Sequence, residues 1–123
     1  GALTSTVNEM PSYEPIDDVD LVSAIPDFNI LIDPAYTADK EGKVDPLLIQ
    51  EQSASPTFIA TAADDPYTAW QYPFVLSRLQ SKTPLAYHIY ETGGHGKGIL
   101  PGPYAFSQWT RECGRWLEDL DRQ

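Results

Sequence analysis

The chain has 123 residues and a mass of 13.7 kDa, a length that fits one domain of about 100–200 residues. Hydrophobic residues make up 41% of it and charged residues 21%, near the averages of globular proteins, which excludes wholesale disorder. Its net charge of −10 repels phosphate backbones, so we expect no nucleic-acid partner. No apolar run approaches the roughly 18 residues of a membrane span, so we expect none.

The acidic charge is concentrated in the first half of the chain. Residues 1–65 carry thirteen acidic side chains against Lys40 and Lys43, whereas residues 66–123 carry five acidic side chains against six basic ones. No block of like charge reaches the roughly 5–6 residues typical of an interaction tail. This pattern favours a solvated acidic face, and an acidic surface that meets a basic partner is the alternative.

Two buried strands are expected in the first half. Residues 17–22 begin with acidic side chains that suit the start of a short helix, which ends at Pro26. Residues 28–32 and 56–63 are nearly all apolar and rich in β-formers, a pattern typical of parallel strands covered on both faces. Between them we expect one turn of helix at residues 45–48.

A helix, a third strand and a final helix are expected in the second half. The first of these helices is expected to begin near Pro73, because proline is tolerated in a first turn, and to end at Ser81-Lys82. A strand over residues 84–90 leads into a glycine-rich loop at 91–102, and a last helix spans residues 104–120. Apolar residues fall on one face of this last helix, which indicates packing against a sheet rather than a partner-binding helix. They are Phe106, Trp109, Cys113, Trp116, Leu117 and Leu120.

Strands separated by crossovers predict an α/β fold with a parallel sheet of three strands, whose carboxyl ends meet at one edge. Asp64 and Asp65 follow the second expected strand, and His95 follows the third. A buried carboxylate that binds one imidazole nitrogen leaves the other nitrogen free to act as a general base. A plain turn at Asp64-Asp65-Pro66 and a loop histidine without function are the alternative.

Three stretches, 28–36, 58–66 and 88–96, resemble the C-terminal half of an α/β-hydrolase of the esterase/lipase group, with acetyl-esterases and dienelactone-hydrolase-like enzymes as the nearest types. The resemblance covers roughly residues 13–120. Its most specific piece is Gly93-Gly94-His95-Gly96 after a strand, preceded by an Asp-Asp-Pro loop. It implies that the three strands match the family's sixth to eighth strands, within a single domain over residues 1–123 of which residues 1–14 are irregular.

The resemblance implies roles for two residues. Asp65, directly before Pro66, matches the catalytic acid, and His95 matches the catalytic base, with Asp64 as the less favoured acid. In the family the residues after the acid are usually small and aliphatic, whereas this chain has Tyr67, Thr68, Ala69 and Trp70. The local shape of this loop is therefore expected to differ.

The nucleophile of the family is missing from this chain. Serine esterases need Gly-x-Ser-x-Gly at a strand-to-helix elbow, and no serine here has glycines at both flanking positions. No His-Gly-Gly oxyanion loop precedes the acid, and Cys113 lies in the helix stripe as a small core residue. We therefore expect a C-terminal segment of a serine carboxylic-ester hydrolase that is inactive alone and acts on a small ester when completed.

The first residue is glycine, which fits removal of a tag, removal of an N-terminal segment, or a piece of a longer product. The strand Phe28–Ile32 is expected to expose a hydrophobic edge, through which two copies would form a homodimer. A non-catalytic, self-associating binding module that retains the acid and the histidine is therefore the alternative function. The sequence does not indicate a compartment.

Other sites have weaker signals. Glycines 94, 96 and 98 with Lys97 lack the spacing of a phosphate-binding loop, and a metal site at His88, His95 and an aspartate is disfavoured because His88 lies within a strand. We expect neither metal nor cofactor, and the single cysteine excludes an internal disulfide. Four aromatic residues either line a substrate cleft or are ordinarily buried: Tyr67, Trp70, Tyr72 and Tyr104.

Overall fold

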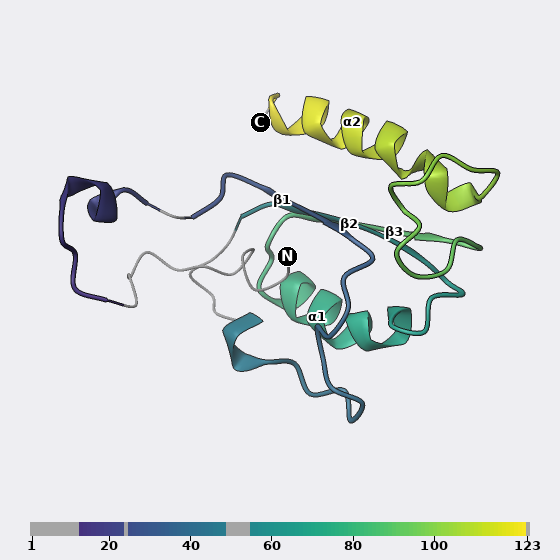
Figure 1. Cartoon of the computed structure of the whole chain (residues 1–123), viewed down its shortest axis with the longest axis horizontal. Coiled ribbons are helices and arrows are strands. Elements are labelled where there is room, and N and C mark those ends of the chain that lie inside the picture. The colour runs from purple at the N-terminus through teal and green to yellow at the C-terminus, as the bar shows by residue number, and fades with distance from the viewer. Residues whose placement is uncertain (1–12, 24, 49–54, 123) are drawn as a thin grey trace.

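A computed structural model describes residues 13–23, 25–48 and 55–122. Of residues 1–14, which are expected to be irregular, residues 1–12 lie outside the described part of the chain, and Tyr13 and Glu14 belong to no helix or strand. The described chain forms a small parallel sheet between two helices, with α1 on one face and α2 on the other (Figure 1). The elements in chain order are β1 (Asn29–Ile32), β2 (Thr57–Ala62), α1 (Thr68–Gln80), β3 (Leu85–Tyr90) and α2 (Trp109–Leu120).

The sheet has three strands in the order β1-β2-β3, all parallel. In the register, Ile32 pairs with Ala60, which pairs with His88, and Ala62 pairs with Tyr90. All six residues of the central strand β2 are buried. The expected α/β fold class, a small parallel sheet flanked by helices, is thereby confirmed.

The alternation of side chains along β2 divides the core into two layers. Ile59 packs with Leu31 of β1 and with Phe74 and Val75 of α1 on one face. The opposite face forms a second cluster, against which Trp109 and Trp116 also pack. The buried residues of this second cluster are Phe58, Ala60, Ala62, Phe106 and Cys113. The apolar stripe of the last helix therefore is core, as its spacing predicted.

The expectation that the first strand is covered on both faces is wrong. Leu31 is buried against α1, but Ile30 is 37% exposed and Phe28, just before the strand, is 43% exposed. The Phe28 ring lies edge-on against Trp116, with 6.1 Å between ring centroids. Within the described residues β1 pairs only with β2, so it is an edge strand, and its side chains on the α2 face are only partly covered.

The expected start of the first long helix near Pro73 is also wrong, because α1 begins at Thr68. The Thr68 hydroxyl donates to the carbonyl of Ala62 at 2.6 Å, and the Thr68 amide donates to the carbonyl of Asp65 at 3.1 Å. These bonds start the helix directly after β2 and leave Pro73 inside it, where the missing N–H removes one helical hydrogen bond. Tyr67 is therefore the N-cap residue of α1, two positions after Asp65, and Trp70 lies in the first turn of the helix.

Short 3₁₀ helices account for the other expected turns. The helix at residues 17–22 is a 3₁₀ turn, η2 (Asp18–Leu21), in which Asp17 and Asp20 form a capping box. The turn expected at 45–48 is η3 (Pro46–Leu48). The last helix begins as η4 (Ala105–Gln108) before it continues as α2. No helix in the described part of the chain is long and apolar enough to cross a bilayer.

Two glycines test this packing by opposite effects. Gly114 is an exposed residue inside α2, and a Cβ there would meet no atom within 4 Å. We expect Gly114→Ala to raise the free energy of unfolding by about 1 kcal/mol, because alanine is the better helix former. Chemical denaturation measures this change.

Gly93→Ala is the matched control. A Cβ at Gly93 would lie 2.7 Å from the Cβ of Phe106 and 3.1 Å from that of Ala62. This substitution is expected to lower stability by about 1–3 kcal/mol through overpacking. Equal effects of the two substitutions would contradict the described packing of η4 on β2.

Candidate active site

The carboxyl ends of the three strands bring polar side chains to one edge of the sheet. Asp33 follows β1, Asp64 and Asp65 follow β2, and the loop of residues 91–98 follows β3. The Ala63 amide donates to the carbonyl of Tyr90 at 2.7 Å and extends the β2–β3 pairing beyond the strands. The register therefore delivers the aspartates and the histidine loop side by side, at the edge where open parallel sheets bind ligands.

Asp65 and His95 form a direct side-chain contact. The distance from Oδ2 of Asp65 to Nδ1 of His95 is 2.9 Å. The Asp65 side chain is fully buried, whereas the His95 side chain is 41% exposed. The other carboxylate oxygen, Oδ1, accepts from the Tyr67 amide at 2.9 Å. This arrangement fixes the carboxylate, orients the imidazole and leaves Nε2 as the ring nitrogen for proton transfer.

Asp64 has a different partner from Asp65. Its Oδ1 accepts hydrogen bonds from the amides of Gly93 at 3.0 Å and Gly94 at 2.7 Å. These bonds hold the backbone directly before His95. The two neighbouring aspartates therefore have different structural roles: Asp64 holds the loop backbone, and Asp65 holds the imidazole.

Asp33 was missed by the sequence reasoning, although it follows a strand just as Asp64 and Asp65 do. Its Oδ2 accepts from the Gly96 amide at 3.0 Å. Oδ1 is buried without a partner among the described residues. Burial raises the pKa of the Asp33 carboxyl to about 6, and the neighbouring charge of Asp65 adds to the rise. Asp64 and Asp33 thus hold the loop backbone on both sides of His95, and Asp65 holds the imidazole.

The glycine-rich loop is shaped around His95 and not around a phosphate. The amides of Gly94 and Gly96 are already bonded to Asp64 and Asp33, and the Lys97 ammonium lies over the Tyr104 ring, 5.3 Å from its centroid. Gly94 and Gly96 have φ of 62° and 72°, a left-handed conformation that favours glycine. The hydrogen bonds of this loop therefore give no support to a phosphate-binding role.

The structure does not bring together the residues of the alternative metal site, His88, His95 and an aspartate. His88 lies in β3 with its ring stacked on Phe58, 5.0 Å between centroids, away from the strand end that carries His95. In the part of the chain that the structure describes, no group of three or more His, Cys, Asp or Glu side chains is arranged to hold a metal ion. Cys113 is buried, and burial raises the pKa of its thiol, so it is suited to the core and not to nucleophilic attack.

No described serine is hydrogen-bonded to His95. The hydroxyls of four serines donate to backbone carbonyls elsewhere, which is a structural use of this side chain. They are Ser55, Ser77, Ser81 and Ser107. Among the described residues, the geometry thus holds an oriented imidazole with no serine hydroxyl bonded to it.

Of the four aromatic residues considered for a substrate cleft, Tyr67 contacts the Asp65–His95 pair directly, and Trp70 contacts Tyr67. The Tyr67 ring lies edge-on against His95, 4.8 Å between centroids, and against Trp70 at 5.4 Å. Tyr72 instead lies near Tyr87, and Tyr104 lies under Lys97. Tyr36 joins the cluster, 5.1 Å from Tyr67, and was missed although it follows the first strand.

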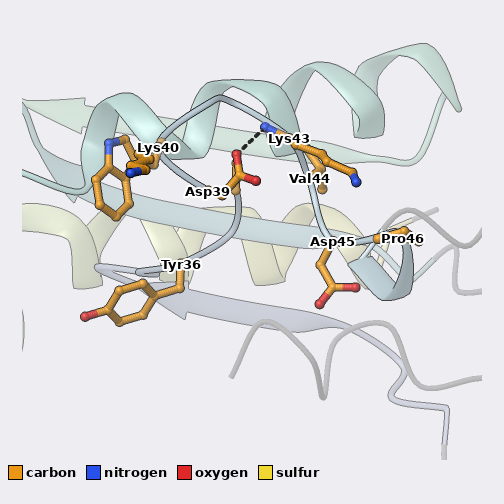
Figure 2. Close-up of a pocket in the computed structure, with 9 residues that line it drawn as sticks. Tyr36, Asp39, Lys40, Lys43, Val44, Asp45 and Pro46 are labelled. Carbon is orange, nitrogen blue, oxygen red and sulfur yellow. Dashed lines mark hydrogen bonds between the residues drawn. The ribbon is translucent and has the colours of Figure 1, made fainter.

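A cavity of about 590 Å³ adjoins this ring cluster. It is lined by the loop of residues 36–46 and by Trp70 of α1. Figure 2 shows this loop, with Tyr36 near one end and Pro46 near the other, and the Asp39 carboxylate bonded to the Lys43 amide at 2.8 Å. The cavity shares Tyr36 and Trp70 with the ring cluster, and Tyr67 connects these two rings to His95.

Comparison with known proteins supports the fold only. No protein-family model matches the sequence, and no curated protein matches it. Among solved structures, the chain is similar to an acetyl ester-xyloside bifunctional hydrolase from Caldicellulosiruptor lactoaceticus, with a TM-score of 0.74 and 23% sequence identity. The match covers 98% of this chain and 52% of the hydrolase. This chain therefore has the fold of about half of that hydrolase.

The burial of Asp33 makes the free energy of unfolding depend on pH, and the raised pKa of its carboxyl group sets the sign of this dependence. Because its pKa rises from 3.8 to about 6, the folded state holds this proton more tightly than the unfolded state. Asp33 thus contributes stability that is complete below pH 3.8 and is lost as pH rises to about 6. The Asp33→Asn variant has no carboxyl group to titrate at this position. The free energy of unfolding of the variant minus that of the wild type should therefore increase between pH 4 and pH 8, by on the order of 2 kcal/mol.

Urea denaturation of both proteins across this pH range measures the difference. A difference that stays constant with pH would contradict the buried, charged Asp33.

Proposed function

We propose that this chain supplies the acid and the base of a serine carboxylic-ester hydrolase, with Asp65 as the acid and His95 as the base. The observation that carries this proposal is the 2.9 Å contact between a fully buried carboxylate and a half-exposed imidazole. Perturbed or paired titratable groups at the carboxyl edge of a parallel sheet are typical of active sites. The fold shared with half of an acetyl ester hydrolase supports a short acyl ester as substrate.

In the proposed reaction, a serine hydroxyl attacks the ester carbonyl carbon while Nε2 of His95 takes the hydroxyl proton. Asp65 stabilises the imidazolium that forms. The carbonyl bond re-forms as the alcohol leaves, and His95 returns the proton to the alcohol oxygen. Water then hydrolyses the acyl-serine by the same proton transfers, which restores the serine and releases the acid.

The serine and the oxyanion donors must come from a part of the enzyme outside these 123 residues, because no Gly-x-Ser-x-Gly occurs in the sequence. The proposal therefore treats the chain as the C-terminal portion of a larger hydrolase, whose missing part contains the nucleophile elbow. An in-frame Gly-x-Ser-x-Gly in the upstream reading frame would support it.

The hydrolysis of phenyl acetate by two proteins tests this function. One is the 123-residue chain, and the other is the complete polypeptide, which also includes the segment encoded upstream in the same reading frame. The chain alone is expected to be no faster than its His95→Ala variant. In the complete polypeptide, Asp65→Asn should lower kcat by about 10⁴-fold, because the imidazole loses its partner.

His88→Gln is the matched histidine control, since His88 lies within the sheet, and it should leave kcat unchanged. Asp64→Asn should cost less than Asp65→Asn. Robust hydrolysis by the chain alone that is lost in His95→Ala would contradict a nucleophile from elsewhere. Full activity of the complete polypeptide with Asp65→Asn would contradict the role of Asp65.

A second candidate function rests on the edge of β1. Ile30 and Phe28 are exposed there, and the strand pairs only with β2 among the described residues. An exposed apolar edge strand is a template for pairing with another chain. We therefore propose, as the second candidate function, a non-catalytic module that self-associates as a homodimer. In this dimer β1 pairs with β1 of a second copy across a two-fold axis.

Light scattering at micromolar concentration distinguishes this candidate. It predicts a dimer that Ile30→Lys converts to a monomer, because a charge on the edge opposes strand pairing. Val19→Lys, at an exposed position of η2, is the control for added charge. A monodisperse wild-type monomer would contradict the homodimer.

A further inference from the structure

A strained tyrosine stands next to the proposed active site. Tyr36 has φ of 57°, a left-handed conformation that is rare for a bulky residue, and its side chain is 71% exposed. The surrounding chain enforces this geometry, because the buried Gln71 donates to the carbonyl of Pro34 at 2.9 Å and Thr37 donates to the carbonyl of Trp70 at 3.2 Å. Burial of an apolar side chain does not explain it, since the ring faces water.

The strain places the Tyr36 ring in a cluster that ends at His95. Its hydroxyl is 3.2 Å from the Tyr67 hydroxyl, and this hydrogen bond raises the pKa of Tyr67. Tyr36 is also 6.4 Å from Trp70, centroid to centroid, and Tyr67 is 4.8 Å from His95. The ring contacts therefore run from the imidazole through Tyr67 to Tyr36 and Trp70, which line the cavity.

The cavity beside these rings has charged side chains in its lining, here called the polar rim, and their charges balance. Its lining includes two acidic and two basic side chains, Asp39, Asp45, Lys40 and Lys43. Such a rim offers hydrogen bonds to hydroxyl groups without selecting an anion or a cation. Pockets of about 300–1,000 Å³ with apolar walls and a few polar groups are typical of small-molecule sites, and 590 Å³ lies within that range.

We propose that Tyr36, Tyr67 and Trp70 form a subsite that binds the ring of a ring-containing ester, an uncharged six-membered ring with an apolar face. This inference rests on the proposed ester hydrolysis, because the subsite derives its purpose from its contact with His95. The ring stacks on Tyr36 and Trp70, its hydroxyl groups contact the polar rim, and the ester bond extends past Tyr67 to the imidazole. An aryl ring and a pyranose share this chemistry.

Binding of unreactive ring compounds to the full chain tests the subsite without any turnover. Benzyl alcohol and methyl β-D-glucopyranoside are titrated into the isotopically labelled protein, with glycerol as the acyclic control, and NMR signals of Trp70, Tyr67 and His95 are followed. We expect at least one ring compound to give saturable shifts at all three residues, and glycerol to give none. The tighter of the two identifies the ring type.

Variants assign the binding to the proposed surface. Tyr36→Gly removes one ring and relieves the left-handed strain, so the protein should remain folded in thermal melts while affinity falls about three- to tenfold. Trp70→Leu should weaken binding to a similar extent. Tyr72→Ala removes an exposed tyrosine of the same helix that lies outside the cluster, and it should leave affinity unchanged.

Two results would overturn the subsite: shifts that are absent from the cluster with both ring compounds, or equal affinity of the wild type and Tyr36→Gly. Failure of the proposed function is a separate observation, namely full esterase activity of the complete polypeptide with Asp65→Asn. Ring binding that Tyr36→Gly weakens, together with such activity, would support the ring subsite but contradict its link to His95.

Discussion

The hydrogen bond between Asp65 and His95 depends on the pairing of β2 with β3 more than on either loop. The pairing continues past both strands through the Ala63 amide and the Tyr90 carbonyl, and it brings the residues after Ala62 level with those after Tyr90. A slip of one residue would exchange the two faces of β3 and separate the carboxylate from the imidazole. The buried central strand, packed on both faces, is what makes such a slip costly.

Around this contact, each neighbouring carboxylate has a structural task. Asp64 and Asp33 hold the backbone amides on both sides of His95, and Asp65 also fixes the amide of Tyr67 at the start of α1. The site is thus preorganised by groups that belong to three strand ends and one helix. Burial of a second carboxylate near Asp65, which raises the pKa of Asp33, is the energetic cost of this arrangement, a common feature of active sites.

The sequence was sufficient for the sheet and for the pair. Apolar runs bounded by Asp-Pro and Gly-Gly predicted all three strands, and the rule that parallel strands end at one edge placed Asp64 and Asp65 near His95. The choice of Asp65 over Asp64 came from the family resemblance. The sequence was insufficient where distant hydrogen bonds decide local structure. The start of α1 at Thr68 depends on Ala62, and the conformation of Tyr36 depends on bonds from α1 to residues 34 and 37. Neither leaves a local pattern, so the helix start was misplaced and Tyr36 was missed.

The tautomer of His95 is the most direct test of a base oriented by Asp65, because it reports on the Asp65 contact whether or not a nucleophile is present. Nitrogen-15 NMR of the labelled chain at a pH where the imidazole is neutral distinguishes the two ring nitrogens. We expect that Nδ1 carries the hydrogen and donates it to Asp65, that Nε2 carries none, and that Asp65→Ala abolishes this preference. A hydrogen on Nε2 in the wild type, or the same tautomer in Asp65→Ala, would contradict a base oriented by Asp65.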